Sequence, residues 1–214
     1  MDGTNGSTTF TDSGPNALTV TAVGNAQIST AQSQFGGASA YFDGTGDYLT
    51  VASHASVAFG LGDFSIECWV NFSAFPTTNT IMGIANTMTS ASSATNTMWW
   101  FGLEDSAGTK RLRLGRHGDG SVYAYVNWTP SSNTWYFLQA TRSSGSTIKL
   151  GINGVSQTVT SSGSNWANNF SSTSILVVGY MATVLAFNGY IDDFRTTKGV
   201  ARDIALPTTA FPNS

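Results

Sequence analysis

Two short segments of this 214-residue chain carry closely spaced carboxylates. The first is the turn-like segment Asp43-Gly44-Thr45-Gly46-Asp47, and the second is the pair Asp192-Asp193. Ca²⁺ takes six to eight oxygen ligands, which include carboxylates and the backbone carbonyls of tight turns. These segments therefore predict a calcium site. The alternative is that Asp43 and Asp47 are ordinary Asx-turn residues, and that one of Asp192 and Asp193 pairs with Arg195 or caps a loop.

Two carboxylates could also act as acid and base on a glycosidic bond. Glutamate occurs only at Glu67 and Glu104, and Glu104 and its neighbour Asp105 would point to opposite faces of a strand. The sequence contains no H-E-x-x-H, no G-x-S-x-G and no glycine-rich phosphate loop. We therefore expect no catalytic residues and no enzyme. A glycosidase-like enzyme is the weaker alternative.

Aromatic side chains are the third chemical resource, because Trp and Tyr combine an apolar ring face, on which a sugar can stack, with a polar group. Tyr123 and Tyr125 share one face of a predicted strand. Of the adjacent Trp99 and Trp100, one should be exposed. Most other rings, Trp69 and Trp135 among them, are assigned to the core, whereas Trp128 and Trp166 lie in turn-like contexts that favour exposure. The candidate ligand-binding residues are Trp100, Tyr123, Tyr125, Trp128, Trp166 and Arg116.

Four of the nine basic residues lie in Lys110-Arg111-Leu112-Arg113-Leu114-Gly115-Arg116. At alternating strand positions they would form one basic face; the alternative is a solvated strand or an edge protected by charge. The formal net charge of −3 gives no general attraction to nucleic acid or acidic membranes, so we expect neither partner. Cys68 lies in an apolar run and is expected to be a small buried side chain.

The elements that must position these residues are strands. Charged residues make up only 10 % of the chain, and the abundant Ser, Thr, Asn and Gly disfavour helices. Residues 64–72 alternate apolar and polar over nine positions, which predicts a long sandwich strand. The short runs that flank the Asp43-Asp47 turn predict a hairpin. Further strands are predicted at 8–10, 18–21, 27–29, 80–84, 98–103, 111–114, 122–126, 134–141, 147–152, 175–179 and 189–195.

About a dozen strands at roughly ten-residue spacing predict an all-β fold, a single antiparallel β-sandwich over residues 1–214. Residues 1–25 form a turn-rich segment packed on it. Residues 203–214 form an extended tail, of which 207–214 leave the fold or link it to another part. No apolar stretch is long enough to span a membrane, and the N-terminus has neither the basic nor the apolar region of a signal peptide.

Four segments in their order resemble the concanavalin A-like, laminin-G-type jelly roll, a lectin/glucanase fold. They are Tyr41–Val51, Gly62–Val70, Trp135–Leu138 with Leu150–Gly154, and Gly189–Arg195. The resemblance implies a structural calcium held by a carboxylate of Asp192 or Asp193 and a carbonyl of Gly44 or Gly46. The full set of candidate metal residues is Asp43, Gly44, Gly46, Asp192 and Asp193.

The four segments resemble in particular the subgroup of this fold that is found in bacterial surface proteins and bacteriophage tail proteins. A narrower resemblance, carried by residues 1–7, 35–40 and 196–202, is to modules of tailed-phage structural proteins. It implies a virion or an extracellular surface as the location. The expected function is non-catalytic binding of a glycan or cell-surface polysaccharide through loops 86–97, 116–120, 127–133 and 161–174. The alternative is a structural or oligomerisation module whose partners are other copies or virion proteins.

Overall fold

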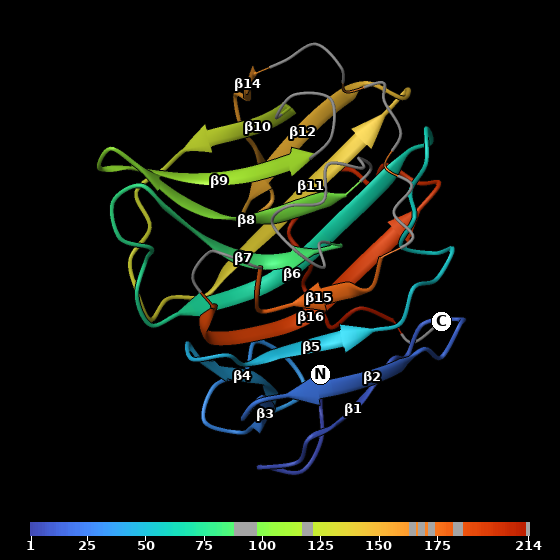
Figure 1. Ribbon diagram of the computed structural model, residues 1–214, viewed down its shortest axis with the longest axis vertical. Helices are drawn as coiled ribbons and strands as arrows, with labels where there is room; N and C mark the ends of the chain where they lie inside the picture. The colour runs from blue at the N-terminus through green and yellow to red at the C-terminus, as the bar shows by residue number, and fades with distance from the viewer. Residues whose placement is uncertain are drawn as a thin grey trace.

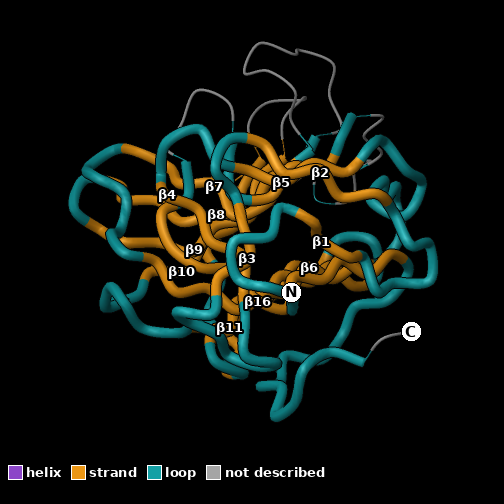
Figure 2. Tube along the Cα trace, turned by 90° about the horizontal axis from the view of Figure 1, so that it is seen from below, coloured by secondary structure: helices purple, strands orange, loops and turns teal. Residues whose placement is uncertain are grey.

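The computed structural model describes residues 1–87, 98–116, 122–162, 166, 170, 174–181 and 186–212. These residues contain no helix (Figure 2). The strands are β1 (Thr9–Thr11), β2 (Thr19–Val23), β3 (Gln27–Ser29), β4 (Ser39–Asp43), β5 (Tyr48–Val51), β6 (Phe64–Phe72), β7 (Thr80–Asn86), β8 (Trp99–Ser106), β9 (Thr109–Arg116), β10 (Val122–Asn127), β11 (Tyr136–Ser143), β12 (Thr147–Ile152), β13 (Val155–Ser156), β14 (Thr160–Ser162), β15 (Leu176–Val178) and β16 (Asn188–Lys198).

The strands form two antiparallel sheets, which confirms the predicted β-sandwich (Figure 1). One sheet has nine strands in the order β1-β2-β5-β15-β7-β8-β9-β10-β14. The other has seven strands in the order β13-β12-β11-β6-β16-β4-β3. Because several sheet neighbours, such as β5 and β15 or β6 and β16, are distant in sequence, a strand's face can be predicted locally but its partner often cannot.

Alternation along each strand builds the core between the sheets. From the nine-stranded sheet, Trp99, Phe101 and Leu103 of β8 point inward and are completely buried. From the seven-stranded sheet, Phe64, Ile66, Cys68, Val70 and Phe72 of β6 do the same, as their spacing predicts. Burial raises the pKa of the Cys68 thiol, so this side chain is a small buried apolar group, as expected.

All nine residues of β6 are buried, which is more than the one-faced burial that its alternating pattern predicts. The reason is a C-terminal strap, residues 199–212, that lies on the outer face of the seven-stranded sheet. The Ser65 hydroxyl donates to the carbonyl of Val200 at 2.8 Å, and the Gln139 amide donates to the carbonyl of Asp203 at 2.9 Å. The N–H of Phe211 donates to Asp193 Oδ2 at 2.9 Å, so the strap stays on the sandwich as far as Phe211, and the expectation that it leaves the fold from residue 207 is wrong up to that residue.

Two tryptophans differ from their core assignment. Trp69 is buried, but on the outer face of the seven-stranded sheet, where it packs edge-on against Phe35 with ring centroids 5.9 Å apart. Trp135 is only half-buried and lies outside the core cluster. Both assignments to the sandwich core were wrong. Trp69 is buried because the outer face of its sheet is covered at this place, and Trp135 directly precedes β11, outside the interior.

The predicted hairpin around the Asp43-Asp47 turn is also wrong. Strand β4 belongs to the seven-stranded sheet and β5 to the nine-stranded sheet, so the turn carries the chain from one sheet to the other. The buried Asp47 carboxylate accepts hydrogen bonds from the backbone N–H of Asp43 at 2.9 Å and of Asn25 at 2.5 Å. Asp47 thus fixes two connections between the sheets, an Asx-type role.

Candidate functional site

Three neighbouring strands present chemically active side chains on the outer face of the nine-stranded sheet. Since Phe101, Leu112 and Ala124 face the core, the alternate positions of β8, β9 and β10 face outward. The register places Trp100, Gly115 and Tyr123 in one row across the strands. Arg113 pairs with Tyr125 in the next row, and Arg111 pairs with Glu104 in the third. We call Trp100, Glu104, Arg111, Arg113, Tyr123 and Tyr125 the aromatic-arginine surface.

Gly115 gives the Trp100 ring its place. A Cβ atom on Gly115 would lie 2.1 Å from Trp100 Cε2, so the indole occupies the space above this glycine. On its other side Trp100 belongs to a small cluster with Met98 and Met181. These contacts leave Trp100 only 6 % exposed. Trp99 is completely buried as well, so the expectation that one of these two tryptophans is exposed is wrong, and Trp100 forms a fixed wall of the surface.

Arg113 lies between two rings. Its guanidinium carbon is 3.9 Å from the ring centroid of Tyr123 and 4.9 Å from that of Trp100, within the range of cation–π attraction. Its Nη1 atom also makes an ion pair with Glu104. Burial lowers the pKa of Arg113 and the Glu104 carboxylate opposes this shift. The guanidinium is held in one orientation by a ring on each side and a carboxylate at its end.

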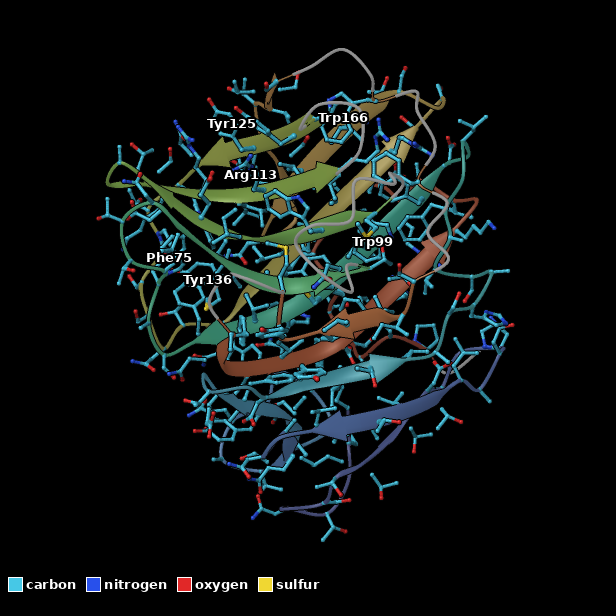
Figure 3. The ribbon with its side chains drawn as sticks, viewed as in Figure 1. Phe75, Trp99, Arg113, Tyr125, Tyr136 and Trp166 are labelled. Atoms are coloured by element: carbon cyan, nitrogen blue, oxygen red, sulfur yellow. The ribbon has the colours of Figure 1, made fainter. Side chains whose placement is uncertain are left out.

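Arg111 repeats the arrangement one row along. Its guanidinium carbon lies 4.2 Å from the ring centroid of Tyr125, and its Nε donates to Asn127 Oδ1 at 3.2 Å. Arg111 Nη1 is 3.6 Å from Glu104 Oε2, so Glu104 bridges the two arginines. Figure 3 shows Arg113 and Tyr125 over the neighbouring strands β9 and β10. The result is a rigid surface with two stacked cations and tyrosine rings of intermediate exposure.

The structure brings together three of the six predicted ligand-binding residues, namely Trp100, Tyr123 and Tyr125. The expected exposure of Trp166 is wrong: it is 6 % exposed and stacks on Phe170, with ring centroids 6.2 Å apart. Trp128 is partly buried and packs against Tyr136 at 4.8 Å. The sequence reasoning missed Glu104, Arg111 and Arg113 as members of the surface, although the alternation of side chains along each strand could have placed them there.

The expectation that residues 110–116 form one basic face is wrong, because successive side chains of a strand point to opposite faces. Arg111 and Arg113 face outward, whereas Arg116 shares the inward face with Leu112 and Leu114 and is 2 % exposed. The alternative of a protected edge is also wrong, because β9 lies between β8 and β10. An odd spacing from Arg113 to Arg116 sends these two side chains to opposite faces.

The five predicted metal residues do not converge on one site. Asp43 pairs with Asn188 at one end of the β4–β16 ladder, and Asp192 lies four residues farther along β16. At the usual rise per strand residue the two carboxylates are about 13 Å apart along the strand. Gly44 and Gly46 stay beside Asp43, at the turn. Among the described residues, no group of three or more His, Cys, Asp or Glu side chains is arranged to hold a metal ion.

Asp192 and Asp193 bind backbone groups instead. Asp192 is 1 % exposed, and its Oδ2 accepts from the N–H groups of Gln34 at 3.0 Å and Phe35 at 3.2 Å. Asp193 Oδ2 accepts from the N–H of Phe211 in the strap at 2.9 Å. Burial raises the pKa of Asp193, and the neighbouring carboxylates of Asp192 and Asp2 add to this.

Glu67 and Glu104 lie on different sheets. Glu67 is on β6, where its Oε2 atom is 2.7 Å from Arg195 Nη2 and its Oε1 accepts from Gln139 at 2.9 Å under the strap. Glu104 is on the outer face of the opposite sheet. Since packed sheets are about 10 Å apart and both side chains point outward, they cannot flank one glycosidic bond.

Parts of the expected binding loops, 88–97, 117–120, 163–165, 167–169 and 171–173, lie outside the described residues. No helix of the described residues is long and apolar enough to cross a membrane.

Comparison with known proteins gives one sequence match and many structural ones. The family model of the concanavalin A-like lectin/glucanases superfamily matches residues 43–201. No curated protein matches the chain in sequence.

Three solved structures illustrate the likeness. The binding domain of Paraclostridial Mosquitocidal Protein 1 has a TM-score of 0.65 at 14 % identity, over 89 % of this chain and 46 % of that one. Domain 4 of AbnA, a GH43 extracellular arabinanase from Geobacillus stearothermophilus solved with arabinotriose, has a TM-score of 0.62 at 16 % identity, over 87 % of this chain and 84 % of that one. The binding domain of botulinum neurotoxin serotype G has a TM-score of 0.64 at 14 % identity, over 91 % of this chain and 46 % of that one. The chain thus spans about half the length of the two toxin domains, and the likeness is one of fold.

Proposed function

This chain belongs to the concanavalin A-like lectin/glucanase superfamily, and we propose that it is a non-catalytic module that binds carbohydrate through the aromatic-arginine surface. The observation that carries the proposal is the fixed position of Arg113 between the rings of Tyr123 and Trp100. The similar arabinanase domain was solved with arabinotriose, which supports a saccharide as the ligand class.

Each group on the surface has a defined part in this proposal. The half-exposed Tyr123 and Tyr125 offer ring edges and hydroxyls to a sugar. Arg111 and Arg113 donate to sugar hydroxyls or carboxylates with N–H groups whose orientation is already fixed, so little side-chain entropy is lost on binding. Glu104 accepts from hydroxyls and holds both arginines in place. With two cations and one carboxylate the surface favours neutral or acidic polysaccharides.

We place the module in a bacteriophage tail or a bacterial surface protein, on the strength of the sequence resemblance alone. In either setting many copies act together, so weak binding by each module would still give firm attachment. The test is a polysaccharide array with wild-type protein and a variant in which Tyr123 and Tyr125 are alanine. Binding that needs both tyrosines supports the proposal, and binding indifferent to them refutes it.

A catalytic role is tested on the same polysaccharides. We expect no release of reducing ends by the wild-type protein, since Glu67 and Glu104 lie on different sheets. Release of reducing ends by the wild-type protein would contradict the non-catalytic assignment, and a variant with both glutamates changed to glutamine would then show whether the glutamates carry the activity.

The second candidate is a structural module that associates with other copies or virion proteins. Val155 on the edge strand β13 is 61 % exposed, and Leu206 of the strap, next to Gly154, is 47 % exposed. Exposed apolar side chains beside a sheet edge favour association. Light scattering after size-exclusion chromatography tests this candidate. An oligomer that Val155→Ser and Leu206→Ser together dissociate supports it, and a monomer refutes it for self-association.

Calcium binding is a separate proposal that concerns Asp192 and Asp193 without Asp43. Burial raises the pKa of Asp193 and the carboxylates of Asp192 and Asp2 add to the shift, so a divalent cation bound here would relieve the part that comes from repulsion. A melting temperature that rises with calcium and falls again with EDTA supports the proposal. An unchanged melting temperature refutes it.

A further inference from the structure

A polar pocket lies at the edge of the seven-stranded sheet, far from the aromatic-arginine surface. It is shallow and open to solvent, with a volume of about 420 Å³, and Thr8, Asn25, Gln27, Tyr41 and Asp43 line it. Figure 1 shows β3 and β4, which carry three of these residues, near one end of the long axis, whereas β10 and β14 lie near the other. The pocket is therefore distinct from the surface described above.

Strand register gives the pocket an aromatic side. Gln27 of β3 pairs with Tyr41 of β4, and Tyr41 pairs with Tyr190 of β16, so the three side chains form one row. Their neighbours Ile28, Ala40 and Ile191 face the core, which directs this row outward. The rings of Tyr41 and Tyr190 lie 5.1 Å apart at 42°.

The polar groups of the pocket have unused hydrogen-bonding capacity. Asp43 Oδ1 accepts from the N–H of Thr45 at 2.7 Å, while its Oδ2 has no hydrogen-bond partner among the described residues. The same holds for the Tyr41 hydroxyl and for the side-chain carbonyl of Gln27, whose amide nitrogen is 3.4 Å from the carbonyl of Asn25. Burial and then the nearby Tyr190 and Asp43 raise the pKa of Tyr41, which keeps the phenol protonated as a donor.

The backbone around these groups is fixed before any ligand arrives. Asp47 accepts from the N–H groups of both Asn25 and Asp43, the two residues at the mouth of the pocket. The N–H of Gly6 donates to the carbonyl of Ile28 at 2.8 Å and ties the N-terminal side to β3. A pocket held in this way loses little entropy when it binds.

We propose that this pocket is a second saccharide site, which takes one neutral sugar residue. An ionised carboxylate that only accepts, an amide that both donates and accepts, and a phenol match adjacent hydroxyl groups of a sugar. A tyrosine ring offers the apolar face against which the C–H groups of a sugar pack. Asp43, with no cation beside it, disfavours acidic sugars, unlike the aromatic-arginine surface.

Two sites at opposite ends of the long axis would let one module join two chains or two parts of one polysaccharide. The second binding step then takes place at a raised effective concentration, which strengthens attachment without new contacts at either site.

The test is an NMR titration of ¹⁵N-labelled protein in EDTA with glucose, galactose and N-acetylglucosamine, each to millimolar concentration. We expect at least one of them to shift the backbone amide signals of Asn25, Gln27 and Asp43. Asp43→Asn keeps an oxygen for the N–H of Thr45 but loses the charge, and should weaken binding about tenfold. Tyr41→Phe removes only the hydroxyl and should also weaken it.

Lys149→Ala is the control, because Lys149 is exposed on β12, near the opposite edge of the seven-stranded sheet, and belongs to neither site, so this titration should be unchanged. Shifts confined to the strands β8 to β10 would overturn the pocket and leave the aromatic-arginine surface standing. No shift at Asn25, Gln27 and Asp43 with any of the three sugars would overturn it as well. Binding that Asp43→Asn does not weaken would also overturn the pocket, and so would binding that requires calcium.

Discussion

The guanidinium carbon of Arg113 lies 3.9 Å from the centre of the Tyr123 ring, across two adjacent strands of the nine-stranded sheet. The two residues are not directly opposite in the register, since Arg113 pairs with Tyr125 and Tyr123 pairs with Gly115. The long arginine side chain therefore reaches diagonally, which the sheet geometry allows. The Trp100 indole lies over Gly115, the residue that pairs with Tyr123, and forms the other side of the place that Arg113 occupies.

Arg113→Lys tests the importance of the planar guanidinium. Lysine keeps the charge but cannot stack flat between Tyr123 and Trp100, so we expect carbohydrate binding to weaken about tenfold. The free energy of unfolding should fall by about 1 kcal/mol because the cation–π contacts are weakened. Calorimetric titration and denaturant unfolding measure the two effects. Binding equal to that of wild type would show that charge alone matters.

Gly115→Ala tests the place of the Trp100 ring. The new Cβ would lie 2.1 Å from Trp100 Cε2, so the indole must move. We expect a loss of about 1–3 kcal/mol in stability and a clear loss of carbohydrate binding. Gly108→Ala is the matched control for carbohydrate binding, since a Cβ at Gly108 would meet nothing within 4 Å, although its positive φ of 84° adds backbone strain. Equal binding by both variants would contradict the role assigned to Trp100.

Asp193→Asn tests the electrostatics of the last strand. The pKa of Asp193 is raised in the folded state, so the native protein binds this proton more tightly than the unfolded chain does. Its contribution to stability is present below the unfolded pKa and is lost as the pH rises through the folded pKa. In EDTA the variant, which can still accept from the N–H of Phe211, should therefore melt higher than wild type at pH 7.

The difference in melting temperature between Asp193→Asn and wild type should shrink as the pH is lowered below the ordinary aspartate pKa of 3.8. Thermal melts at neutral and acid pH measure it. A variant less stable than wild type at pH 7 in EDTA would contradict this reading.

Arg142→Met tests a buried cation that no sequence motif marks. Arg142 is completely buried, and its guanidinium donates to the carbonyls of Gly60 at 2.7 Å, Gly62 at 3.1 Å and Trp166 at 3.2 Å. Burial lowers its pKa to about 10. Methionine would fill the space between Phe64 and Phe170 but remove the donor to the carbonyls of Gly62 and Trp166, whereas the Gly60 carbonyl keeps the N–H of Phe170. We expect a loss on the order of 3–5 kcal/mol in denaturant unfolding, and a loss under 1 kcal/mol would contradict it.

The features that depend on the alternation of side chains along a single strand could be predicted from the sequence. The long strand at 64–72, the shared face of Tyr123 and Tyr125, and the buried Cys68 all follow from a period of two. The same alternation along residues 110–116 would have placed Arg113 and Arg116 on opposite faces of the strand. The prediction of one basic face did not take this alternation into account.

The features that depend on pairing between strands distant in the sequence could not be predicted from the sequence. The segments on either side of the Asp43-Asp47 turn look like a hairpin, yet each has a better partner elsewhere: β4 pairs with β16, and β5 with β2 and β15. The separation of Asp43 from Asp192 follows from that register. The burial of Trp166 depends on Phe170 and Arg142, which no local pattern connects to it.

Polysaccharide binding by paired variants tests the central claim most directly. Wild type, a Tyr123→Ala/Tyr125→Ala variant and a Tyr48→Ala control are applied to one polysaccharide array, and calorimetry follows on the best ligand. Tyr48 stacks on Tyr180 at 5.3 Å, away from the aromatic-arginine surface, so its loss removes an aromatic pair of similar kind. We expect the double variant to bind at least about tenfold more weakly and the control to bind as wild type does. Equal binding by all three proteins would contradict the claim that this surface binds carbohydrate.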